Sequence, residues 1–195
     1  MREYTIVRKP ADWEQVPVLP IDTLLWSPEV PISAEARICY DEDALYVQMQ
    51  AVEPQIRAED RDILGEPCND SCLEFFFCPI TGDTRYFNIE YNPNACMYLG
   101  FGDIGRLVRL VPDEAMFRPQ VAFTDDGWRI TYQIPISFIQ HFFPAFRAES
   151  GASIRANCYK CGDLTVQPHY FSWNPMTSET PAFHRPNDFG LMHLE

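Results

Sequence analysis

The fold class of this 195-residue chain is decided by residues 71–91, which read SCLEFFFC (71–78), PITGDT (79–84) and RYFNIEY (85–91). Both outer runs are rich in aromatic and β-branched residues, which favour strands, and the glycine-containing segment between them favours a turn. The stretch therefore predicts an antiparallel hairpin of two neighbouring strands.

Alternation divides the side chains of this hairpin between two faces, because successive residues of a strand point in opposite directions. One face is wholly apolar and predicts the core: Leu73, Phe75, Phe77, Phe87, Ile89 and Tyr91. The opposite face collects Glu74, Tyr86, Asn88 and Glu90. A carboxyl group in such an apolar strand needs a partner, so this second face is the first place to look for a site.

The same pattern of short alternating strands and polar turns continues outward in both directions. It predicts strands at 37–40, 45–52, 71–78, 85–91, 95–101, 120–123, 128–134, 154–161, 170–173 and 190–194. Helical signal is confined to 136–146, which leaves no crossover helices for a parallel fold. We therefore predict an all-β protein, a two-sheet antiparallel β-sandwich of the jelly-roll or immunoglobulin type with about ten strands and one short helix.

Length and charge limit the organisation and the partners of the chain. No linker, repeat or low-complexity tract interrupts residues 1–195, so a single domain is expected. The net charge of −13 disfavours a phosphate backbone and an acidic membrane surface, so neither nucleic acid nor membrane is expected as a partner. The sequence carries no information on the oligomeric state.

Cysteine usage bears on the compartment. The seven cysteines are an odd set for a disulfide framework, and several lie within apolar strand-like runs, where a reduced thiol acts as a small hydrophobe. No apolar signal segment precedes the first strand. These features favour a reducing, cytoplasmic setting.

The polar face of the hairpin allows three interpretations. Carboxyl, amide and phenol groups together suit sugar hydroxyls, each of which donates and accepts hydrogen bonds. Alternatively, Glu74, Tyr86, Asn88 and Glu90 form a self-satisfied network that braces the sheet. Glu74 and Glu90 could also serve a small glycoside-active enzyme, which needs two carboxyl groups at a fixed separation. No hydrolase motif accompanies them, so we assign no catalytic residue.

Tryptophan faces are the usual platform for sugar rings. Trp128 alternates in phase with Ile130 and is expected in the core. Trp173 and Asn174 lie where a strand runs into a loop, so Trp173 is either a ligand platform or part of the core. Trp26 lies in an irregular segment and could take either role.

The cysteine pair Cys158 and Cys161 has the spacing of half a zinc site. No second pair accompanies it, and two strand residues three apart point to opposite faces, so no metal site is predicted there.

Short motifs along nearly the whole chain resemble the family 9 carbohydrate-binding modules. They occur in family order: 36–38 with 45–47, 69–76, 86–90 with 92–93, 127–128 with 134–135, 157–159, 172–175, 183–186 and 189–191. The resemblance implies a DOMON-like β-sandwich that binds mono- or oligosaccharides between two tryptophans and nearby polar side chains. Some members of the family carry structural calcium, so calcium is the one cofactor that the resemblance allows.

The resemblance assigns roles to particular residues. Trp173 corresponds to one half of the tryptophan clamp, Glu74 to the acidic position, and Asn88 lies in the strand of polar contacts. The second tryptophan is expected near 66–69, where this chain has Glu-Pro-Cys-Asn; Trp26 and Tyr86 are the aromatic residues that could replace it.

A haem-binding redox module is a further alternative, because some DOMON-like relatives hold haem through Met and His. Met49, Met97 and His184 are the candidate ligands here, but no haem-attachment motif is present.

Overall fold

A computed structural model describes all residues from Met1 to Glu195. Its fourteen strands are β1 (Glu3–Arg8), β2 (Leu19–Ile21), β3 (Thr23–Leu25), β4 (Ser33–Tyr40), β5 (Ala44–Val52), β6 (Cys72–Cys78), β7 (Tyr86–Tyr91), β8 (Met97–Asp103), β9 (Arg106–Leu110), β10 (Gln120–Phe123), β11 (Gly127–Pro135), β12 (Ser153–Cys161), β13 (Tyr170–Ser172) and β14 (Gly190–Leu194). The helices are α1 (Glu114–Phe117), α2 (Ile136–Phe142) and the short 3₁₀ turns η1 (Trp13–Gln15), η2 (Pro67–Asn69) and η3 (Pro186–Asp188). The protein is thus mostly β, as predicted, and no helix is long and apolar enough to cross a bilayer.

The hairpin predicted at 71–91 is confirmed as β6 and β7, paired antiparallel with Phe75 opposite Ile89. Its apolar face lies in the main core, where Phe75 and Phe77 are stacked with ring centroids 5.1 Å apart. Ten of the strands lie at or within a few residues of the predicted positions. Alternation was sufficient for strands such as β5 and β11, which bury one face, whereas β10 has no buried residue and was recognised by the turn that follows it.

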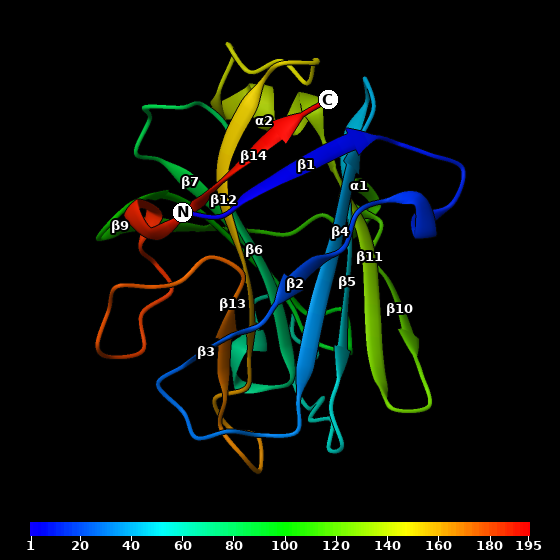
Figure 1. Cartoon of the computed structure of the whole chain (residues 1–195), viewed down its shortest axis with the longest axis vertical. Coiled ribbons are helices and arrows are strands. Elements are labelled where there is room, and N and C mark those ends of the chain that lie inside the picture. The colour runs from blue at the N-terminus through cyan, green and yellow to red at the C-terminus, as the bar shows by residue number, and fades with distance from the viewer.

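The sheet topology corrects the prediction of a purely antiparallel two-sheet sandwich. Eleven strands form one continuous path, β10-β11-β5-β4-β1-β14-β12-β6-β7-β8-β9. The path is continuous because β1 pairs in parallel with β14 along its first part and with β4 at its end. Figure 1 shows β1 lying beside β14. The result is a curled mixed sheet.

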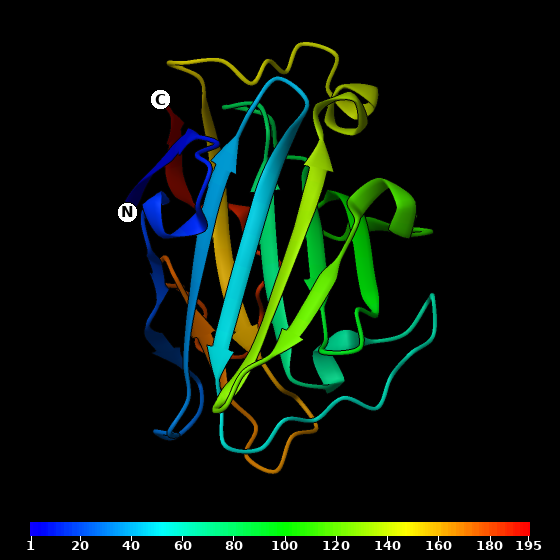
Figure 2. The same ribbon diagram turned by 90° about the vertical axis from the view of Figure 1, so that its right-hand side faces the viewer.

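The curled sheet encloses one core between its two halves. In Figure 2 the half with β4, β5 and β11 lies in front of the half with β6, β7 and β12. The rings of Tyr91 on β7 and Tyr132 on β11 meet across this core, with centroids 4.9 Å apart. Trp128 is fully buried here, as the sequence predicts.

A buried ion pair joins the two halves at one end of the core. Lys160 on β12 and Glu53 directly after β5 are almost fully buried, and Lys160 Nζ lies 3.4 Å from Glu53 Oε2. The carboxylate also accepts hydrogen bonds from Trp128 Nε1 at 2.7 Å and Ser71 Oγ at 2.8 Å. Because both charges are out of water, the pair depends on these additional partners.

His169 completes this network on the lysine side. Its Nε2 lies 2.8 Å from Lys160 Nζ and its Nδ1 lies 2.8 Å from Gln167 O. The two contacts fit a neutral imidazole that accepts from the ammonium and donates to the carbonyl. Burial, and next the charge of Lys160, lowers the pKa of His169 from 6.5 to about 4.

This histidine makes stability depend on pH. In the unfolded chain this histidine takes up a proton near pH 6.5, whereas in the folded protein its pKa is about 4. Its contribution to the free energy of unfolding is therefore complete above pH 6.5 and is lost as the pH falls from 6.5 to 4. We expect proton uptake by His169 in the unfolded chain to lower the free energy of unfolding by up to about 3 kcal/mol between pH 7 and pH 4.

The measurement is urea unfolding at several pH values, with His169→Gln as the comparison, since glutamine can both accept and donate there. Carboxyl groups titrate equally in both proteins, so the difference between their pH slopes isolates the histidine. Equal slopes between pH 7 and pH 4 would contradict the expectation.

Candidate functional site

A cavity of about 290 Å³ lies on the outer face of the half-sheet that holds β6, β7 and β12. Its floor contains Glu74, Glu90 and Cys161, and rings of four aromatic residues line it: Trp26, Tyr98, Tyr170 and Phe183. Glu66, Cys68, Asp163, Pro181, Ala182 and His184 complete the lining. The cavity is near the lower end of the size range of small-molecule sites.

Glu74 and Glu90 reach the floor because of strand alternation and register. They occupy directly opposite positions on β6 and β7, on the face that points away from the core. Their exposed fractions are only 2% and 5%, and neither forms an ion pair. Burial raises the pKa of Glu74, and burial together with the charge of Glu74 raises the pKa of Glu90. Raised pKa values favour protonated carboxyl groups, which can donate as well as accept hydrogen bonds.

Asn88 and Tyr86, also predicted as ligands, share the face of β7 that carries Glu90, but neither lines the cavity. Asn88 is fully buried, and its Nδ2 donates to Glu90 Oε1 at 2.8 Å. Its side chain occupies the space above Gly100, the opposite residue on β8, where a Cβ would meet Asn88 Oδ1. The hydroxyl of Tyr86 lies 3.0 Å from His184 Nδ1. Asn88 therefore positions a pocket carboxyl, and Tyr86 contacts a residue of the wall.

The aromatic wall is assembled from three separate segments. Trp26 follows β3, Tyr170 begins β13, and Phe183 belongs to the loop between β13 and η3. The Trp26 ring lies 5.8 Å from Tyr170 and 5.6 Å from Phe183, centroid to centroid. Its Nε1 donates to Ser178 O at 2.8 Å, which fixes the ring against the loop. The indole is half-buried, so part of it faces the cavity.

Trp173 and Asn174 are not brought to the pocket. The Trp173 side chain is 3% exposed, belongs to the main core and meets the Tyr4 ring edge-on at 6.5 Å. Asn174 accepts a hydrogen bond from the backbone N–H of Arg2 at 2.7 Å and donates to Asp188 O at 2.7 Å. A ring so buried offers no face to a ligand, so core packing, the alternative for Trp173, is what the structure shows.

Several lining residues escaped the sequence analysis. The outward orientation of Tyr98 could have been predicted, because Met97 and Leu99 on either side of it point into the core. Tyr98 then lies directly opposite Glu90 on the outer face. Tyr170 and Phe183 gave no such signal, since their positions depend on how the loop before η3 folds over the sheet. Phe183 is held there by stacking on Tyr159, with centroids 4.1 Å apart.

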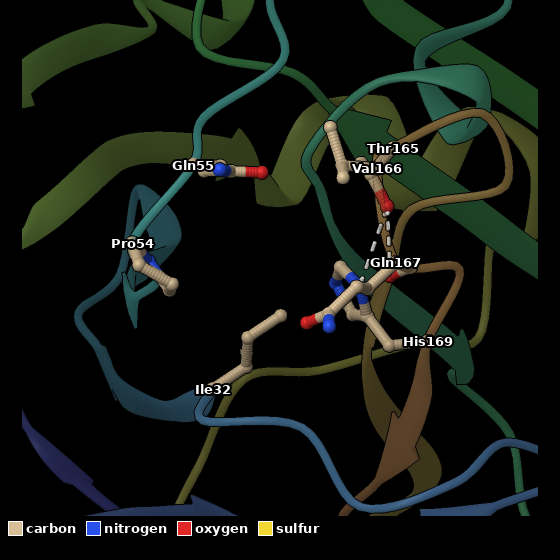
Figure 3. Close-up of a pocket in the computed structure, with 7 residues that line it drawn as sticks. All are labelled: Ile32, Pro54, Gln55, Thr165, Val166, Gln167 and His169. Carbon is tan, nitrogen blue, oxygen red and sulfur yellow. Dashed lines mark hydrogen bonds between the residues drawn. The ribbon is translucent and has the colours of Figure 1, made fainter.

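A second hollow, of about 170 Å³, lies beside His169 (Figure 3). Figure 3 shows Pro54 and Gln55 on one side of it and Gln167 with His169 on the other. It has no aromatic wall except the imidazole, which is engaged with Lys160. The larger pocket therefore offers the better combination of apolar faces and polar groups.

One family model matches nearly the whole chain, and several solved structures share its fold. A family model described as carbohydrate-binding family 9 matches residues 6–194. No curated protein matches the chain. Among solved structures, a candidate carbohydrate-binding protein from Bacteroides uniformis is 24% identical with a TM-score of 0.85, covering 100% of this chain and 99% of that one.

Two further structures are complexes of a family 9 carbohydrate-binding module from Caldicellulosiruptor kristjanssonii. The complex with glucose is 14% identical with a TM-score of 0.73, and covers 100% of this chain and 96% of that one. The complex with cellotriose is 14% identical with a TM-score of 0.72, and covers 100% and 94%.

Proposed function

The chain belongs to carbohydrate-binding family 9, and from this premise we propose that it binds carbohydrate, without catalysis, in the pocket over β6, β7 and β12. The observation that carries the proposal is the combination of two buried carboxyl groups in the floor with a wall of aromatic rings. Family membership supports carbohydrate as the ligand, and the lining of the pocket supports this location for it.

The chemistry of the pocket matches the two kinds of surface that a sugar presents. A pyranose has apolar C–H faces, which pack on aromatic rings such as those of Trp26 and Phe183. It also has hydroxyl groups that both donate and accept, which Glu74 and Glu90 can meet with protonated or ionised oxygens. A buried polar floor of this kind favours ligands that satisfy it.

Glucose and short β-linked glucose oligosaccharides are the ligands we propose. Solved modules of this family hold glucose and cellotriose. The cavity of about 290 Å³ is small, which supports contact with one or two sugar units rather than a long chain.

Calorimetric titration tests this function. We expect saturable binding of both glucose and cellotriose at one site per chain, with affinities within about tenfold of one another (about 1.4 kcal/mol) because the additional unit lies largely outside the cavity. Equal-sized polyols without a pyranose ring serve as the control. Absence of saturable heat with every sugar would overturn the proposal, and a far tighter cellotriose complex would show that the site extends beyond the pocket.

The two alternatives, a glycoside-active enzyme and a haem-binding redox module, have less support. A glycosidase needs one carboxylate held ionised beside one acid, but neither Glu74 nor Glu90 forms an ion pair, and burial raises the pKa of both. For haem, Met49 and Met97 are both buried in the main core, whereas His184 lines the outer pocket. The candidate axial ligands are therefore not brought together.

The calcium that the family resemblance allows has no free buried carboxylate outside the pocket to bind it at Glu53 or Asp70. The most buried carboxylates besides those of the pocket already face side-chain cations: Glu53 faces Lys160, and Asp70 Oδ1 lies 3.1 Å from Arg57 Nε. We accordingly propose no calcium site at either. All seven cysteines are free thiols, which supports the proposal that the protein works in a reducing setting.

A further inference from the structure

Two thiols and one carboxyl group converge beneath the pocket. Cys72 at the start of β6 and Cys161 at the end of β12 are directly opposite one another in the antiparallel pairing. Glu74 lies two residues after Cys72 and so shares its face. All three side chains are buried, and their ligand atoms lie within 4.8 Å of one another.

The thiol of Cys161 has two acceptors within reach, Glu74 in the cluster and, at 3.8 Å, the backbone carbonyl of Cys68. The thiol of Cys161 donates to Glu74 Oε1 at 2.9 Å. Glu74 has no cation within ion-pair distance. Lys160, the residue before Cys161, points to the opposite face of β12 and pairs with Glu53. The cluster is therefore a set of buried groups that all become anionic on losing a proton, with no positive charge among them.

The donor types select a class of cation. Ca²⁺ and Mg²⁺ bind through shells of oxygen atoms, which two sulfur atoms do not provide. Zn²⁺ takes Cys sulfur and carboxylate oxygen together in a tetrahedral shell, with bonds of about 2.0–2.3 Å and hence ligand atoms about 3.5–3.8 Å apart. Separations of 2.9 Å and up to 4.8 Å bracket that range, so small rotamer changes suffice.

The site is also open on one side. Cys161 and Glu74 line the cavity, whereas Cys72 lies beneath them. A cation held by the three would face the cavity with its fourth position, where a water molecule or the nearby thiol of Cys68 can bind. Three protein ligands with one open position is an arrangement that zinc accepts.

We propose that Cys72, Glu74 and Cys161 form a binding site for one thiophilic divalent cation, of which Zn²⁺ is the best fit, in the floor of the pocket. This site goes beyond carbohydrate binding and does not rest on it, because its ligands are defined by their own convergence. Cys161 lies far along the chain from Cys72 and Glu74, so no sequence motif identifies the site. The pair Cys158 and Cys161 does have a motif spacing, but its members face opposite sides of β12.

The test is titration of the whole reduced protein, without sugar, first with Co²⁺ and then with competing Zn²⁺. Binding to thiolates gives a charge-transfer band in the near ultraviolet, which Zn²⁺ should abolish by displacing Co²⁺. We expect one Co²⁺ per chain and Zn²⁺ binding at least about 100-fold weaker in Cys72→Ala and Cys161→Ala, because losing even an outer partner of a ligand weakens metal sites by about 10–100-fold.

Cys78→Ala is the matched control, since Cys78 is a buried thiol on the same strand and the same face at its other end. It should retain the band, and Zn²⁺ should raise the melting temperature of the wild type and of this control but not of Cys161→Ala. If Cys72→Ala does not fold, Cys161→Ala and Glu74→Gln still decide the result. No thiolate band in the wild type, or an equal loss in Cys78→Ala, would overturn the site, and neither result bears on the sugar titrations.

Discussion

Replacing Lys160 by methionine is expected to lower the free energy of unfolding by about 3–5 kcal/mol, the usual cost of removing one partner from a buried ion pair. Methionine fills much of the lysine volume but leaves Glu53 buried without a cation, with only Trp128 and Ser71 as donors. It also removes the donor to His169 Nε2. At this end of the core the two halves of the sheet then remain joined through Glu53 only by its hydrogen bond from Ser71.

Urea unfolding at pH 7 measures the effect. Lys9→Met is the matched control, because Lys9 is a surface lysine whose ammonium lies 3.9 Å from Asp41 and over the Tyr46 ring; there we expect a change below about 1 kcal/mol. Adding Glu53→Gln to Lys160→Met should restore part of the loss, since it removes the unpaired charge. A Lys160→Met protein as stable as the Lys9→Met control would show that the ion pair contributes little.

The second large effect concerns the pocket. Trp26→Ala is expected to weaken glucose binding by about 2 kcal/mol or more, which is about 30-fold in affinity, because a half-buried indole in a binding site is a typical hot spot. The ring provides apolar surface for the sugar and, through its hydrogen bond to Ser178, holds the loop that carries Phe183. Both contributions disappear together in the alanine variant.

Calorimetry with glucose measures this change, and Trp13→Ala is its control. Trp13 lies in η1, outside the pocket, so its removal should leave the affinity within about twofold of the wild type (under about 0.5 kcal/mol). Trp26→Phe separates the two contributions, since phenylalanine retains a ring but cannot donate to Ser178. Unchanged affinity in a folded Trp26→Ala protein would place the sugar elsewhere on the molecule.

The floor of the pocket followed from the sequence because it depends on local rules. Alternation along 71–78 and 85–91, and a turn between them, were enough to put Glu74 opposite Glu90 on the outer face. The β12 pairing with β6 was not predictable in the same way, because its register is set by contacts between residues far apart in the chain. For that reason the sequence did not bring Cys72 and Cys161 together.

The sequence around Trp173 also carries a signal for core packing. Phe171 and Trp173 alternate in phase, and both are buried, while the intervening Ser172 points the other way. The motif at the end of the strand favoured a loop platform, but the backbone N–H of Trp173 donates to Cys158 O at 2.9 Å and keeps the strand geometry one residue longer. The wall instead came from Tyr170 and Phe183, whose positions only the folded loop determines.

The two parallel pairings of β1 also have a consequence for folding during synthesis. The strand leaves the ribosome well before its main partner, β14, which lies more than 180 residues further along the chain. Contacts of such long sequence separation raise the contact order and slow folding. The nascent chain therefore carries an unclosed sheet with open edges through most of translation, a stage at which unpaired strands are prone to aggregate. Residues 190–194 join β1 to β12, so the two halves of the sheet connect along this path only when β14 has been made.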